Sequence, residues 1–252
     1  MKPQFVFPNL LTALSLSCGL FVIFKMNMIH PGTAVIEQVT SCVRILLFAA
    51  VCDLLDGTVA RAMNAKSEFG IFFDSMADGV SFGVAPSVVV LKTLSAVPGT
   101  VVSAFLTSGA MIFSVAGILR LVRFSTAASL DENKPKIAFH GLPITCAGLA
   151  AISPTFFLMS IDLENDMARA LIAIFVFCSL GYLMVSTWQF PSLKVINVRF
   201  SSFHLLITLV AFFSLILFMI LQNFAAALLV FTWGYVFGSW VYACYTQTSL
   251  KI

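Results

Sequence analysis

Charged residues are scarce in this chain and make up only 10% of its 252 residues, whereas a soluble globular domain typically has about 25%. Hydrophobic residues make up 60% of the chain, which excludes an ordinary soluble domain. Because a membrane-spanning helix needs about 20 mainly apolar residues, the length allows about seven or eight spans. We therefore expect one integral-membrane domain over residues 1–252, with no separate soluble domain.

Cysteine pairs with the spacing of a redox motif or a metal site are missing. The chain has six cysteines but no C-x-x-C sequence, and we interpret them as small apolar side chains. Internal repeats and low-complexity tracts are missing too. The net charge of +3 is modest, so we expect membrane lipid, and not nucleic acid, as the surroundings of this chain.

Apolar windows separated by polar or turn-rich breaks predict an all-α polytopic bundle of about eight transmembrane helices. The expected helices are 8–29, 39–62, 69–91, 100–122, 141–161, 168–188, 203–221 and 225–246. Pro86 should kink the third of them. We expect a core over about residues 1–200, followed by two scaffold helices over about 203–246. Tryptophan and tyrosine side chains near span ends, Tyr235 among them, are interpreted as interface belts.

The basic residues predict the orientation in the membrane. With the N-terminus in the cytoplasm, ten of the fourteen lysines and arginines fall on or near the inside and four fall outside. This asymmetry favours a multi-pass protein of the cytoplasmic membrane with both termini inside. The link between the second and third helices, residues 62–68, then lies on the cytoplasmic face.

Four of the eleven acidic residues lie close together at the ends of the second and third helices: Asp53, Asp56, Asp74 and Asp78. Residues three or four apart share one face of a helix, so each helix presents two of these carboxylates together. Two helices joined by a short link pack antiparallel, which lets all four converge. An uncompensated charge in the membrane core costs about 3 kcal/mol, so a cation is expected between them.

Clustered carboxylates suit a hard divalent cation such as Mg²⁺ or Mn²⁺, which also accepts oxygens from phosphate. Two such ions can clamp a phosphoryl group that is being transferred. Nearby, Gly57 leaves space for a nucleotide to approach the backbone, and Arg61 offers a planar charged group suited to pyrophosphate. The pattern indicates a site for a metal-bound nucleotide phosphate.

The segment from Asp53 to Asp78 has the form D-x2-D-G-x2-A-R-x8-G-x3-D-x3-D. This is the signature of the CDP-alcohol phosphotransferase family, and the chain resembles that family at all eight specified positions. A chance match is well below about one in a million at average amino-acid usage.

The resemblance implies roles for individual residues. The four aspartates correspond to the ligands of the two metal ions, and Asp78 also to the general base. Gly57, Arg61 and Ser67 match positions that hold the CDP moiety of CDP-diacylglycerol, and Asn9 and Thr12 match an element on the cytidine side. A homodimer is also typical of the family.

The signature does not specify the acceptor alcohol, so other segments must. Residues 75–86, 120–124, 139–143 and 183–194 resemble blocks of the bacterial family members that transfer a phosphatidyl group to L-serine. His140, Thr145 and Cys146 stand in and after the third of these blocks, where blander residues are expected. Arg120 and Arg123 stand one turn apart and suit either a carboxylate or lipid headgroups.

Two alternatives remain at this point. The first is the same chemistry with glycerol 3-phosphate, inositol phosphate or choline as the acceptor. The second is a secondary transporter, because carboxylates within a membrane also mark ion pathways. A transporter would place its charges near the midplane of repeated halves, whereas this chain has one acidic set beside a cytoplasmic link. The sequence therefore favours a metal-dependent phosphatidyltransferase whose acceptor is serine.

Overall fold

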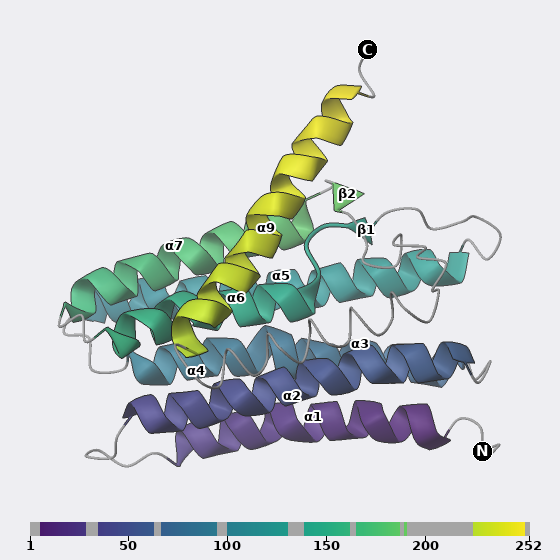
Figure 1. Ribbon diagram of the computed structural model, residues 1–252, viewed down its shortest axis with the longest axis horizontal. Coiled ribbons are helices and arrows are strands. Elements are labelled where there is room, and N and C mark those ends of the chain that lie inside the picture. The colour runs from purple at the N-terminus through teal and green to yellow at the C-terminus, as the bar shows by residue number, and fades with distance from the viewer. Residues whose placement is uncertain are drawn as a thin grey trace.

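A computed structural model describes residues 6–28, 35–62, 67–94, 100–130, 139–161, 165–186, 189–190 and 224–249. Its helices lie side by side in a bundle, with the last one crossing it obliquely (Figure 1). The elements are α1 (Val6–Asn27), α2 (Val35–Ala62), α3 (Glu68–Asp78), the π-helix η2 (Gly79–Val84), α4 (Ala85–Thr93), α5 (Thr100–Leu130), α6 (Ile144–Ser160), α7 (Asp166–Val185) and α9 (Phe224–Ser249).

The polytopic helical architecture expected from hydropathy is confirmed for the described residues. Five helical segments are long and apolar enough to cross a membrane: Phe7–Asn27, Val35–Val59, Val101–Thr126, Asp166–Val185 and Phe224–Val241. Large apolar side chains such as Phe105, Met111 and Phe175 are exposed on them, as expected of surfaces that face lipid. The expected helix 203–221 lies outside the described residues.

The third expected helix, 69–91, is helical from Glu68 to Thr93 but is interrupted by η2. Ser67 begins it as an N-cap whose Oγ accepts a hydrogen bond from the Gly70 N–H at 3.0 Å. Pro86 follows η2 within the first turn of α4. Since proline has no N–H to donate to the carbonyl four residues back, it lies where the regular hydrogen-bond pattern changes, and the predicted irregularity takes the form of a π-helix.

Two details differ from the expected all-α architecture. Helix α5 continues to Leu130 instead of ending near residue 122, because a helix can extend past the apolar window that predicted it. Before α6, β1 (Phe139–His140) pairs antiparallel with β2 (Gln189–Phe190). Gly141 follows β1 at φ +83°, and a Cβ there would collide with the Met184 carbonyl. Only glycine fits this turn.

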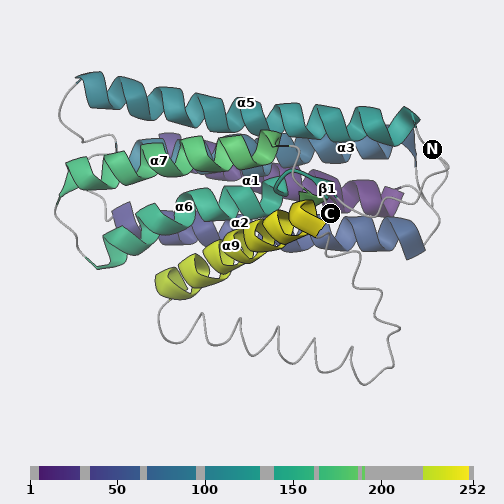
Figure 2. The ribbon, with the colours of Figure 1, turned by 90° about the horizontal axis from the view of Figure 1, so that it is seen from above.

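The core lies where α1, α2, η2, α5, α6 and α7 meet. Phe82, Phe113 and Phe177 are among its largest fully buried side chains, and the rings of Phe113 and Phe177 lie 5.5 Å apart. Helix α6 lies between α5 and α9 (Figure 2). In the same bundle, the start of α1, the end of α2 and the start of α3 lie at one end (Figure 1).

Candidate active site

Three of the four aspartates come together between α2 and α3. Carboxylate oxygens of Asp53, Asp56 and Asp74 all lie within 4.8 Å of one another. Asp56 is 5% exposed, and the other two are partly buried. The i, i+3 spacing on α2 places Asp53 and Asp56 on one face. Direct packing of α2 on α3 was expected, but α3 packs mainly against α1, which also packs against α2, and Asp74 reaches the two α2 carboxylates from there. We call these three residues the carboxylate cluster.

Asp78 lies one turn after Asp74, where α3 passes into η2. It is not part of the carboxylate cluster as defined by the 4.8 Å separation. Its side chain is nevertheless within electrostatic reach of Asp53, Asp56 and Asp74, and of Arg120 on α5. The fourth aspartate therefore interacts with the three carboxylates of the cluster and with Arg120 without belonging to the cluster itself.

Two threonines from other helices orient the aspartates of α2. The Thr12 hydroxyl of α1 donates a hydrogen bond to Asp56 Oδ2 at 2.7 Å, and that of Thr145 on α6 donates to Asp53 Oδ2 at 3.1 Å. Thr12 was expected beside the cytidine, and in the structure it holds a carboxylate. Sequence reasoning missed Thr145 as a site residue, although it was already noticeable as a departure from its block.

The donor set fits a hard divalent cation. Opposite oxygen ligands of a six-coordinate Mg²⁺ lie about 4 Å apart, close to the separation within the carboxylate cluster. Three carboxylates at such distances repel one another, and they do so more strongly where water is scarce. A metal ion bound by Asp53, Asp56 and Asp74 would relieve that repulsion.

The residues expected to hold the nucleotide lie around the start of α3 and the end of α2. A Cβ built on Gly70 would lie 3.0 Å from Ser67 Oγ and 3.2 Å from Asn9 Oδ1, so both polar side chains border this glycine. Gly57 is exposed and has open space where a Cβ would stand. The backbone of Arg61 belongs to the last turn of α2, and its side chain lies outside the described part of the chain.

The two arginines of α5 have different surroundings. Arg120 is partly buried, is within electrostatic reach of Asp78, and has a buried Nε that finds no hydrogen-bond partner in the described part of the chain. Arg123 is exposed, and its guanidinium donates a long hydrogen bond of 3.4 Å to the Val185 carbonyl at the end of α7. Of the pair, Arg120 is the one that interacts electrostatically with Asp78.

Directly after Asp78, η2 is wedged between neighbouring helices. The Ser81 hydroxyl donates to the Ser15 carbonyl of α1 at 3.0 Å. A Cβ on Gly19 of α1 would lie 2.7 Å from Ser81 Cα, and one on Gly148 of α6 would lie 2.6 Å from the Phe82 carbonyl oxygen. The backbone that carries Asp78 is therefore held by direct contact with two glycines.

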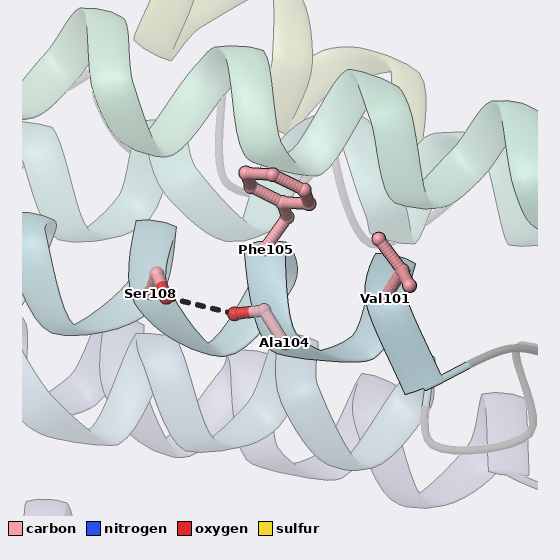
Figure 3. A pocket seen from close by; sticks show the side chains of 4 residues that line it. All are labelled: Val101, Ala104, Phe105 and Ser108. Carbon is pink, nitrogen blue, oxygen red and sulfur yellow. Dashed lines mark hydrogen bonds between the residues drawn. The ribbon is translucent and has the colours of Figure 1, made fainter.

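A separate hollow of about 320 Å³ lies near the start of α5, lined by Val101, Ala104, Phe105 and Ser108 (Figure 3). Its one hydrogen-bonded side chain is Ser108, whose hydroxyl donates to the Ala104 carbonyl at 2.8 Å. Twelve residues separate Ser108 from Arg120, about 18 Å along a helix. The hollow has no charged lining residue and takes no part in the site described above.

Comparisons with known proteins agree on one family. Residues 5–181 match the model of CDP-alcohol phosphatidyltransferase. The chain is 30% identical to the CDP-diacylglycerol–serine O-phosphatidyltransferase of Helicobacter pylori, over 82% of this chain and 81% of that protein. It is 32% identical to the protein of that name from Bacillus subtilis, over 74% and 90%, and 30% identical to that from Methanocaldococcus jannaschii, over 68% and 78%.

Proposed function

Because the chain belongs to the CDP-alcohol phosphatidyltransferase family, we propose that it transfers the phosphatidyl group of CDP-diacylglycerol to L-serine and releases CMP. The observation that carries this proposal is the activity named for relatives that align over most of the chain. Helix ends that bring three carboxylates within 4.8 Å supply a matching site. The transporter interpretation has no comparable support.

The metal would be Mg²⁺ or Mn²⁺, two ions per site, held by Asp53, Asp56 and Asp74 together with Asp78. Bound there, it would neutralise charge on the pyrophosphate of CDP-diacylglycerol. Thr12 and Thr145 fix the two α2 carboxylates in orientation through their hydrogen bonds. Hydrogen bonds of this kind, made to the ligands and not to the metal, typically change the metal affinity of a site.

The CDP moiety would lie along the ends of α2 and α3. Asn9 and Ser67 offer polar groups beside Gly70, and the open space at Gly57 leaves room for the nucleotide. Arg61, one turn beyond Gly57, would bind a phosphate. The acyl chains would remain in lipid, against the exposed apolar faces of the bundle.

Asp78 would act as the general base. Its carboxylate takes the proton of the serine hydroxyl as the serine oxygen forms a bond to the phosphorus that bears diacylglycerol. The bond from that phosphorus to the CMP oxygen breaks, so CMP leaves with the electron pair. The proton on Asp78 then passes to water, and the products are phosphatidylserine and CMP.

Arg120 would bind the serine carboxylate, because it faces Asp78 and has a buried Nε available. Arg123, which is exposed, would instead anchor the end of α5 at the headgroups. The basic residues favour a cytoplasmic-membrane protein with both termini and the site facing the cytoplasm. A homodimer is proposed from family membership alone.

An acceptor assay tests this function. Purified enzyme receives labelled CDP-diacylglycerol with L-serine, glycerol 3-phosphate, inositol 1-phosphate or choline, and the lipid products are resolved. We expect phosphatidylserine from serine only, loss of turnover with a chelator, and recovery with Mn²⁺ or Mg²⁺. A phosphatidylglycerophosphate product would overturn serine as the acceptor, and full turnover after verified metal removal would overturn the metal site.

A further inference from the structure

Two polar atoms near the carboxylate cluster are buried and have no hydrogen-bond partner among the described residues: Arg120 Nε on α5 and the Tyr235 hydroxyl on α9. The two side chains lie within electrostatic reach of each other and of Cys146 on α6. Ser239 approaches the phenol from one turn further along α9 without reaching hydrogen-bond geometry. A buried donor without an acceptor loses its hydrogen bond to water and gains none in return, so two together indicate a missing polar group.

The position of these atoms relates them to the reaction. Arg120 faces Asp78, and Cys146 follows Thr145, the residue that donates to Asp53. Tyr235 is partly buried against the apolar core in the middle of α9, and is not at a helix end as an interface belt would require. Helix α9 packs against α6, whose first turn carries Cys146.

Helix α9 lies beyond residues 5–181, the part of the chain that matches the family model. The part that matches the family model carries the carboxylates and Arg120, and α9 carries the Tyr235 phenol. We propose that Tyr235 completes the acceptor subsite by donating a hydrogen bond to the acceptor's carboxylate, whose other oxygen binds Arg120. This inference rests on the proposed function and names a residue that selects the acceptor.

The chemistry of the two groups fits a carboxylate. The Arg120 Nε is one of the donors that a guanidinium uses for side-on, two-bond contact with a carboxylate, and a tyrosine hydroxyl is a neutral donor. An acceptor without a carboxylate would leave both donors buried and unsatisfied. Sites built this way reject analogues that lack the paired group.

The test compares full-length wild-type enzyme with Tyr235→Phe, and with Tyr182→Phe as a matched control because Tyr182 is 66% exposed. Kinetics are measured with L-serine and with serinol, which keeps the hydroxyl and ammonium but lacks the carboxylate. For Tyr235→Phe we expect the serine KM to rise about tenfold, the loss of one hydrogen bond to a charged group. The KM for CDP-diacylglycerol and the kinetics with serinol should stay unchanged.

The ratio of kcat/KM for serine to that for serinol is the deciding quantity, because it does not depend on how much of the variant is folded. A tenfold fall in this ratio supports the subsite. An unchanged ratio, with or without an equal loss on both acceptors, overturns it and makes Tyr235 structural. A wild-type enzyme that makes no phosphatidylserine would overturn the proposed function itself, which is a separate result.

Discussion

Asp78 stands beside the carboxylate cluster and directly before η2. Different interactions hold these two regions in place. The aspartates of the cluster are oriented by side-chain hydrogen bonds from Thr12 and Thr145. The π-helix is held by backbone packing, with Gly19 and Gly148 directly against it. Hydrogen bonds to a charged carboxylate set its orientation and charge, whereas close packing sets the position of the chain. Substitutions in the first region should therefore change chemistry, and those in the second should change stability.

Asp56→Asn should produce the largest effect on turnover. It removes a charged ligand from the carboxylate cluster. Losing only a hydrogen-bond partner of a metal ligand costs up to about 100-fold, so losing the ligand itself should lower kcat by more than that. The thermal unfolding temperature in metal-free detergent should stay level or rise, because one buried charge and its repulsion are lost. Near-normal turnover would show that Asp56 is not a ligand. Asp78→Asn tests the proposed base in the same assay.

Gly148→Ala should lower the thermal unfolding temperature more than it lowers turnover. The new Cβ would lie 2.6 Å from the Phe82 carbonyl oxygen, a backbone atom that cannot rotate away. Overpacking of this kind costs about 1–3 kcal/mol, which thermal unfolding in detergent can measure. Gly238→Ala is the matched control, since nothing lies within 4 Å of a Cβ there. Equal unfolding temperatures for both variants would contradict the packing role of Gly148.

Sequence predicted the helices well because lipid leaves few alternatives for an apolar segment. It also predicted the convergence of Asp53, Asp56 and Asp74, since helical spacing is a local property. Asp78 stays outside that 4.8 Å group, and α3 packs mainly on α1, which no local pattern indicates. The π-helix depends on contacts of Phe82 and Ser81 with other helices, which no local pattern records. Tyr235 was expected in an interface belt, whereas the structure has it partly buried against the core in the middle of α9. A tyrosine in an apolar helix has the same local pattern in either position, so the sequence alone does not separate the two.

Thr145→Val should have an effect of intermediate size, on the metal requirement for activity and not on stability. It keeps the shape of the side chain but removes the hydroxyl that donates to Asp53 at 3.1 Å. Outer contacts of this kind change metal affinity or activity by about 10–100-fold, so the Mn²⁺ concentration for half-maximal activity should rise. Thr145→Ser should restore it. An unchanged metal requirement in Thr145→Val would show that Asp53 needs no orienting partner.

The smallest effect is expected where a side-chain hydrogen bond joins two helices away from the carboxylates. Ser153 of α6 and Thr232 of α9 have hydroxyls 3.0 Å apart, and each also has a carbonyl of its own helix in reach: Ala150 for Ser153 and Leu228 for Thr232. Because each hydroxyl keeps that partner when the other is removed, little is left unsatisfied.

A double-mutant cycle of Ser153→Ala and Thr232→Val should therefore give a coupling free energy of about 0.6 kcal/mol, typical of such pairs in membranes. The measurement is thermal or denaturant unfolding of the four proteins in one detergent. A coupling above about 2 kcal/mol would mean that hydrogen bonds, and not packing, hold α9 on α6. A small value would show that packing contributes more than this hydrogen bond to holding α9 on α6.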